Sequence, residues 1–285
     1  MDHAKLDWRL ASKATYLIHQ RFRYDYPGPI RDLRHRLMIV PRLRHGDQRR
    51  IVQRLDVLPA TTAVFGPDEF GNELAVVSIP HVDLCLEFEH WSIVERDTTY
   101  GEHRVGAGDL HDPRFRAQTR LTVADGDLQE VAHALRSAHP DPLELADAIN
   151  AFVHATMRYA PDVTDVSTTA AAAFALRRGV CQDYAHVMLA IARACGLAAR
   201  YVSGHLLGEA GTHAWVEILV PSAGEALVAA FDPTHGRRPS LGYLVVAIGR
   251  DYGDVAPTSG VFSAPYAGKL RAQKRVGVSA VEYAA

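Results

Sequence analysis

The sequence predicts an α+β protein with two unlike parts, an N-terminal antiparallel β domain and a unit in which helices precede an antiparallel sheet. Residues 14–95 form short alternating or apolar runs, residues 142–195 carry apolar side chains at helical spacing, and residues 199–232 return to strand patterns. At 285 residues, with 48% hydrophobic and 22% charged residues, the chain can form two modest domains. We expect a β domain of residues 1–110 and a second domain of residues 111–285.

The first domain reads as strands separated by turns. Typical turn sequences are Pro27-Gly28-Pro29 and Gly71-Asn72. The strand patterns fall at residues 14–24, 34–40, 51–58, 73–79 and 82–95. Residues 31–54 include eight arginines against two aspartates, but charge on the solvent face and edges of a sheet keeps it soluble. Without a basic domain excess or an aromatic stacking pattern, we expect a protein-docking face here and no nucleic-acid binding.

The second domain begins with three predicted helices. Pro142 stands at the first position of a helix that closes near Tyr159. Thr168 and Thr169 cap a second helix, and Gly179 ends it. The third helix runs from residue 182 to residue 195, so Cys181 lies at a helix N-terminus.

Three strand patterns follow, at residues 199–206, 213–220 and 226–232. The last two are joined by a turn around Ala223-Gly224, so they form an antiparallel hairpin. His213 opens one of these strands and Asp232 ends the other. Folding the hairpin places His213 opposite position 233 or 234, which makes Asp232 its immediate or diagonal neighbour.

These three residues suit nucleophilic catalysis. A cysteine attacks a carbonyl as its thiolate, which a helix N-terminus stabilises by only ~0.3–1 kcal/mol, so a nearby imidazolium must supply most of the activation. His213 can supply that charge while Asp232 orients the ring. The backbone N–H of Cys181 is the natural donor to an oxyanion, since it lies at the helix start.

At the same residues the chain resembles the bacterial branch of the transglutaminase-like superfamily, whose members share papain-like cysteine chemistry. The matching stretches are residues 179–186 (GVCQDYAH), 199–204 (ARYVSG), 213–217 (HAWVE), 231–234 (FDPT) and 249–257 (GRDYGDVAP). The resemblance implies a papain-like core preceded by the family's N-terminal β domain. It also implies that Cys181 is the nucleophile, His213 the base and Asp232 the residue that orients the base. His235 stands where relatives usually have asparagine.

We therefore expect a cysteine hydrolase, a peptidase or amidase, that attacks a peptide, isopeptide or related amide through an acyl-enzyme, with a peptide or protein as its substrate. Transamidation or acyl transfer by the same triad is an open alternative, and so is a non-catalytic peptide-binding module.

Four further residues are candidates for the substrate groove or its support: Gln182, Tyr159, Tyr201 and Trp215. The two tyrosines either line the groove or pack inside the protein, and Trp215 either shields the His-Asp pair or belongs to the core. His186 lies about 140° around the helix from Cys181 and should not share its face.

Composition excludes several classes of site and partner. The formal net charge is −2, so the chain has no global field for nucleic acid or an anionic membrane. Its three cysteines, Cys85, Cys181 and Cys195, lie far apart and indicate neither a disulfide framework nor a zinc ribbon. We expect no metal site, no cofactor, no membrane span and a cytoplasmic location. The oligomeric state is left open.

Overall fold

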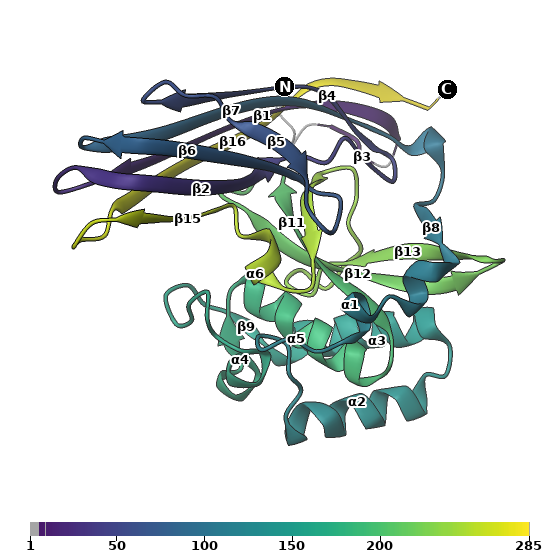
Figure 1. The fold of residues 1–285 in the computed structure, drawn as a ribbon. Helices are drawn as coiled ribbons and strands as arrows, with labels where there is room; N and C mark the ends of the chain where they lie inside the picture. The colour runs from purple at the N-terminus through teal and green to yellow at the C-terminus, as the bar shows by residue number, and fades with distance from the viewer. Residues whose placement is uncertain (1–5, 9, 285) are drawn as a thin grey trace.

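The computed structural model describes residues 6–8 and 10–284. Figure 1 shows two stacked β layers at one end of the molecule, helices at the other, and a further sheet between them. The strands are β1 (Ala11–Asp25), β2 (Ile30–Val40), β3 (Arg44–His45), β4 (Gln48–Leu58), β5 (Val64–Pro67), β6 (Glu73–Val82), β7 (Cys85–Asp97), β8 (Arg104–Gly106), β9 (Arg158–Tyr159), β10 (Arg178–Gly179), β11 (Ala198–Leu206), β12 (His213–Ser222), β13 (Glu225–Phe231), β14 (Tyr243–Gly249), β15 (Thr258–Ser263) and β16 (Lys269–Tyr283). The helices are α1 (Pro113–Arg116), α2 (Gly126–Ala138), α3 (Pro142–Thr156), α4 (Ala170–Leu176), α5 (Cys181–Ala194) and α6 (Tyr252–Val255).

The stacked layers are a β sandwich. One sheet has the order β16-β1-β7-β4-β3 and the other the order β15-β2-β6-β5. Alternate residues of these strands point inward, and the buried cluster between the sheets includes Phe22, Leu33, Val77 and Phe88. The predicted antiparallel β domain is confirmed, because the period-two pattern gives each strand one apolar face that another sheet must cover.

The second part has a sheet of order β14-β11-β12-β13-β8 with helices on one face. Helix α5 packs on β11 and β12 and is surrounded by α2, α3 and α4. Every residue of α5 from Gln182 to Arg193 is buried, so this helix is the centre of the domain rather than an amphipathic surface helix. The α+β class is confirmed.

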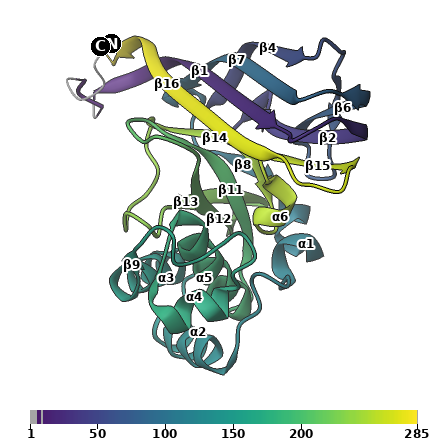
Figure 2. The same ribbon diagram turned by 90° about the vertical axis from the view of Figure 1, so that its left-hand side faces the viewer.

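The chain's last strands cross the division predicted at residue 110. β16 pairs with β1 along its length and β15 pairs with β2, so residues 258–283 complete the sandwich, as Figure 2 shows. Conversely, β8 pairs with β13 in the other sheet. Sequence alternation gives the face of a strand but not its partner, so it could not reveal these non-local pairings.

Two buried amides of the sandwich fix its position on the sheet β14-β11-β12-β13-β8. The Gln48 side chain donates to the Val245 carbonyl at 2.7 Å and accepts from the Val245 N–H at 2.8 Å. Asn72 makes the same pair of bonds with Ile248, at 2.7 Å and 2.9 Å. These side chains satisfy backbone groups of β14 that no neighbouring strand could reach. The sheet that carries His213 is thereby held against the sandwich.

Among residues 6–8 and 10–284, the structure contains no helix with the length and apolar character of a membrane span.

Candidate active site

Cys181 is the first residue of α5. The Asp183 carboxylate accepts a hydrogen bond from the Val180 N–H at 2.7 Å and another from the Thr164 hydroxyl at 2.7 Å, which fixes the start of the helix. The N–H groups of a first helical turn have no intrahelical acceptor, and the dipole there is positive. The local structure thus favours negative charge on the Cys181 sulfur, which is partly exposed.

The hairpin of β12 and β13 brings His213 to Asp232. Val216 pairs with Phe231, and continuing that register places His213 opposite Thr234. The His213 Nε2 atom lies 2.8 Å from Asp232 Oδ2, as the sequence predicted. Both side chains are buried, with 2% and 0% of their surface exposed.

Asp232 is held as an anion by several donors. Besides His213, the Tyr243 hydroxyl donates to Oδ2 at 2.6 Å, the His235 ring contacts the same oxygen at 2.8 Å, and the Thr234 N–H donates to Oδ1 at 2.9 Å. Burial alone would raise the pKa of this carboxyl, but the bonds from His213, Tyr243 and His235 hold it well below the usual range. The carboxylate therefore remains charged across the physiological range.

His213 faces Cys181 with its other nitrogen. Burial opposes the charged ring, but the hydrogen bonds with Asp232 and with Cys181 outweigh this effect and raise the pKa of His213 to about 10. Because Nε2 is taken by Asp232, Nδ1 is the ring nitrogen on the side of the pocket that Cys181 and His213 line together. Cys181 and His213 line one pocket and Asp232 lies behind the His213 ring, which is the order that nucleophilic catalysis requires.

A pocket of about 440 Å³ opens over Cys181 and His213. Its lining comprises Tyr159, Cys181, Glu209, Ala210, Thr212, His213, Thr234 and His235. Tyr159 is 61% exposed, so of the two tyrosines it is the one placed to meet a substrate. The sulfur is reachable from solvent while Asp232 behind it is not.

The other predicted groove residues lie elsewhere. Tyr201 is 2% exposed and packs beside His186, so it belongs to the core. Gln182 is also buried, and its amide is directed at the Asp165 carbonyl, 3.5 Å away. Trp215 is buried and stacks near His213, with ring centroids 6.1 Å apart, so it covers the inner side of the triad histidine.

His186 points away from the reacting face, as predicted. It is fully buried, and its Nε2 accepts a hydrogen bond from the Tyr252 N–H at 3.2 Å.

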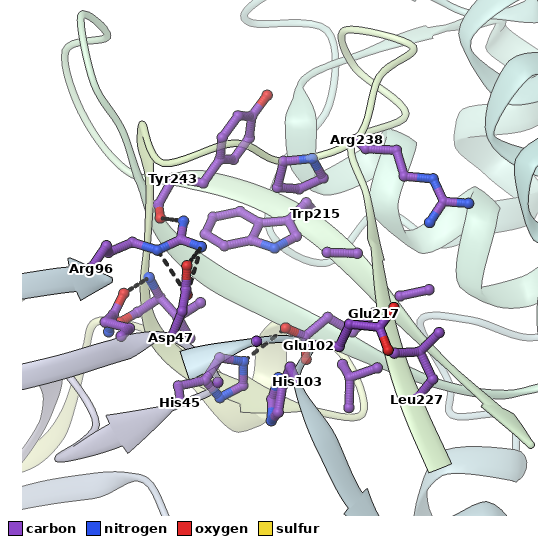
Figure 3. A pocket seen from close by; sticks show the side chains of 18 residues that line it. His45, Asp47, Arg96, Glu102, His103, Trp215, Glu217, Leu227, Arg238 and Tyr243 are labelled. Carbon is purple, nitrogen blue, oxygen red and sulfur yellow. Dashed lines mark hydrogen bonds and ion pairs between the residues drawn. The ribbon is translucent and has the colours of Figure 1, made fainter. Parts of the chain in front are cut away.

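Behind the triad, a second cavity of about 320 Å³ lies between the sandwich and the sheet (Figure 3). Trp215 and Tyr243 form part of its wall, and His45, His103 and Glu217 another part. These last three could in principle share a metal ion, a possibility that the sequence did not suggest.

The bonding of Glu217 argues against that use. Its Oε1 lies 2.7 Å from His45 Nε2, and its Oε2 accepts from Arg200 Nε at 2.7 Å. Both oxygens are therefore committed, and a dication would lie beside a guanidinium. We interpret the cluster as a buried ion-pair network that ties the sandwich to β12. The other possible group, His213, Asp232 and His235, is the triad itself with its neighbour.

Sequence reasoning missed Tyr243, Glu209 and the position of His235. Tyr243 begins an apolar strand, and nothing in that pattern tells that its hydroxyl reaches Asp232. Glu209 lies in the loop between two strands, where sequence assigns no partner. His235, three residues after Asp232, was noted only as a departure from relatives, although short spacing after the acid was a signal for a shared contact.

Comparison with known proteins agrees with this geometry. Residues 129–228 match the model of the transglutaminase-like superfamily, and residues 16–95 match that of the bacterial transglutaminase-like N-terminal region. The chain belongs to the transglutaminase-like superfamily. It is 27% identical over 260 residues to an uncharacterized protein of Mycobacterium leprae, covering 84% of this chain and 90% of that protein.

Two other relatives bear on fold and chemistry. A protein-glutamine gamma-glutamyltransferase of Pseudomonas aeruginosa is 33% identical over 145 residues, which cover 45% of this chain and 21% of that protein. The crystal structure of a "putative cysteine protease" from Cytophaga hutchinsonii superimposes with a TM-score of 0.76 at 21% identity, covering 95% of this chain and 93% of that one. The Cytophaga hutchinsonii structure confirms that the β sandwich and the helix-covered sheet occur together in one fold.

Proposed function

We propose that the protein is a thiol hydrolase of peptide, isopeptide or related amide bonds, with Cys181, His213 and Asp232 as its catalytic triad. The observation that carries the proposal is the placement of a helix-N-terminal thiol and His213 in the lining of one open pocket, with His213 bonded to the buried Asp232 behind it. Membership of the superfamily and the cysteine-protease description of the Cytophaga fold relative are consistent with it.

The steps follow from the positions of these groups. The Cys181 thiolate attacks the amide carbonyl carbon, and the oxyanion that forms is placed to accept from the backbone N–H of Cys181. As the carbon–nitrogen bond breaks, the His213 imidazolium gives its Nδ1 proton to the departing amine, leaving a thioester. Water then loses a proton to His213, attacks the thioester and releases the acid and the thiolate.

Transamidation is the second candidate. The named activity of the Pseudomonas relative, glutamyl transfer from protein glutamine, favours it. The same thioester would react with an amine instead of water, with no change in the triad. Partition of the thioester between water and an added amine separates the two reactions.

The test is the alkylation rate of Cys181 by iodoacetamide from pH 5 to 9, with the modified thiol located by mass spectrometry. If the proposal holds, the wild-type rate should be nearly constant over this range, as expected for a thiol paired with an imidazolium. In His213→Ala the rate should rise about tenfold per pH unit up to about pH 8.5, as for an ordinary thiol.

His81→Ala is the matched control, since His81 is exposed and lies on the sandwich. It should keep the flat profile of the wild type. If wild type and His213→Ala rise together toward pH 8.5, there is no activated thiol, and the peptide-binding module becomes the better account.

A further inference from the structure

The loop between β11 and β12, residues 207–212, places a carboxylate at the mouth of the Cys181 pocket. Gly208 and Gly211 in this loop have φ values of 92° and 114°, which side-chain-bearing residues rarely adopt. The tight path that they allow turns Glu209 back over the site. Its Oε2 lies 3.4 Å from His213 Nδ1, and its Oε1 lies 3.2 Å from His235 Nε2.

These contacts leave the Glu209 carboxylate able to accept further hydrogen bonds from a group in the pocket. Both are longer than the 2.8 Å contacts that His213 and His235 make with Asp232, and the side chain is 42% exposed. A carboxylate has about four lone-pair positions, so acceptor capacity remains toward the pocket. Among the pocket-lining residues that the structure describes, Glu209 is the one carboxylate and none is a lysine or arginine.

Tyr159 presents an aromatic ring to the same space. Its pKa is raised by partial burial and then by the negative charges of Cys181 and Glu209, so its hydroxyl is close enough to sense both. An exposed tyrosine ring together with a carboxylate is a combination that attracts ammonium and guanidinium groups, through the ring's quadrupole and the charge.

One basic side chain on another element is influenced by Cys181 without lining this pocket. Lys274 of β16 senses the charge of Cys181, but its Nζ lies over the Phe22 ring, 5.4 Å from the centroid, and outside the lining. The entrance therefore holds the Glu209 carboxylate beside His213, whose positive charge Asp232 already shares.

We propose that Glu209, with the Tyr159 ring, is the specificity-determining site for a positively charged substrate group, such as a lysine or arginine side chain or an α-ammonium beside the scissile carbonyl. This inference rests on the proposed function of Cys181 and names the substrate class of that site. Glu209 acts by attraction and takes no part in bond breaking.

The test uses three methanethiosulfonate reagents that transfer a thioalkyl group to a thiolate and release methanesulfinate. One carries a trimethylammonium group, one a sulfonate and one is the neutral methyl compound. The measured quantities are the rates at Cys181, each charged reagent relative to the neutral one, at pH 7 and low salt. Dividing by the neutral rate removes any general change in thiol reactivity.

We expect Glu209→Gln to lower the relative rate of the cationic reagent about tenfold and to raise that of the anionic reagent by a similar factor, the size expected for one charge pair at ~5 Å in a partly hydrated site. Tyr159→Leu should lower the cationic ratio about threefold, whereas Tyr159→Phe, which keeps the ring, should not change it. Glu225→Gln is the matched control, because it removes an equal charge at the distant hairpin turn.

The two proposals fail differently. If Glu209→Gln leaves both relative rates as in the wild type while Cys181 still reacts rapidly, the specificity proposal is overturned and the triad stands. If Cys181 reacts with the neutral reagent no faster than free cysteine does at pH 7, the proposed function fails first.

Discussion

Strand β12 carries two buried charge clusters of opposite design, four residues apart. Glu217 has both oxygens bonded, to His45 of the sandwich and to Arg200 of the adjacent strand. His213 is bonded on one side to Asp232, while its other nitrogen meets a sulfur that opens to solvent. In the first cluster both carboxylate oxygens are bonded to protein groups, and we interpret it as structural. In the second cluster the Asp232 side of His213 is buried and the Cys181 side faces a pocket, so a substrate could reach it.

The largest effect should come from the acid that backs the open cluster. Asp232→Asn removes the charge that stabilises the His213 imidazolium, and the new amide can favour the wrong tautomer of the His213 ring. Acylation of Cys181 by 4-nitrophenyl acetate at pH 7 should therefore slow about a thousandfold. Asp147→Asn, at an exposed acid, is the control and should change nothing. An acylation rate within tenfold of the wild type would show that Asp232 is merely structural.

A substitution in the Glu217 cluster should lower the free energy of unfolding and leave the acylation rate of Cys181 nearly unchanged. Glu217→Gln leaves the Arg200 charge buried without a full counter-charge, and the free energy of unfolding should fall by about 3–5 kcal/mol in urea titrations. Acylation of the folded variant by 4-nitrophenyl acetate should remain within about threefold of wild type. A large rate loss with unchanged stability would reverse the roles that we assign to the two clusters.

The pH dependence of stability should distinguish the buried neutral histidines from the charged His213. Burial lowers the pKa of His186 and His205 to about 4 and that of His90 to about 3, so the unfolded chain binds protons that the folded one does not. Their contribution is present above about pH 6.5 and is lost as the pH falls toward 4, by up to about 1.4 kcal/mol per pH unit for each.

Urea unfolding at pH 5, 6 and 7 measures this slope, and His186→Gln should reduce it. For His213 the sign is opposite, because its folded pKa is raised to about 10: its contribution is present below about pH 6.5 and is lost as the pH rises through 10. His213→Ala should therefore not flatten the acid slope, and between pH 6 and 7, where the unfolded chain loses this proton, it should make the rise of stability with pH steeper. If His213→Ala flattens the acid slope as His186→Gln does, the positive charge that we assign to His213 is contradicted.

The smallest effect belongs to an exposed pair. Arg238 makes two bonds to Asp147, but both side chains are about half exposed. Arg238→Ala should cost at most about 1 kcal/mol in the same urea titration, and less in high salt. A loss comparable with that of Glu217→Gln would mean that burial is not what separates these ion pairs.

The sequence determined the local elements and the register of one hairpin. Period-two and helical spacing place α3, α5, β12 and β13 within a few residues of their observed bounds, because each pattern reflects which face of an element is buried. The short turn then fixes His213 against Asp232, and a helix start fixes the setting of Cys181. Contacts that follow from short loops and from element ends can be read from the chain.

Only the tertiary structure decided the contacts made across long separations. The return of β16 to β1, the Tyr243 hydroxyl on Asp232, the His45–Glu217 bond and the position of Glu209 depend on how strands from distant segments pair and how a glycine-bent loop turns. Alternation says which way a side chain points but not what it meets, since the partner is chosen by the packing of whole sheets. The three residues of the proposed triad were therefore visible in the sequence, and the residues that surround them were not.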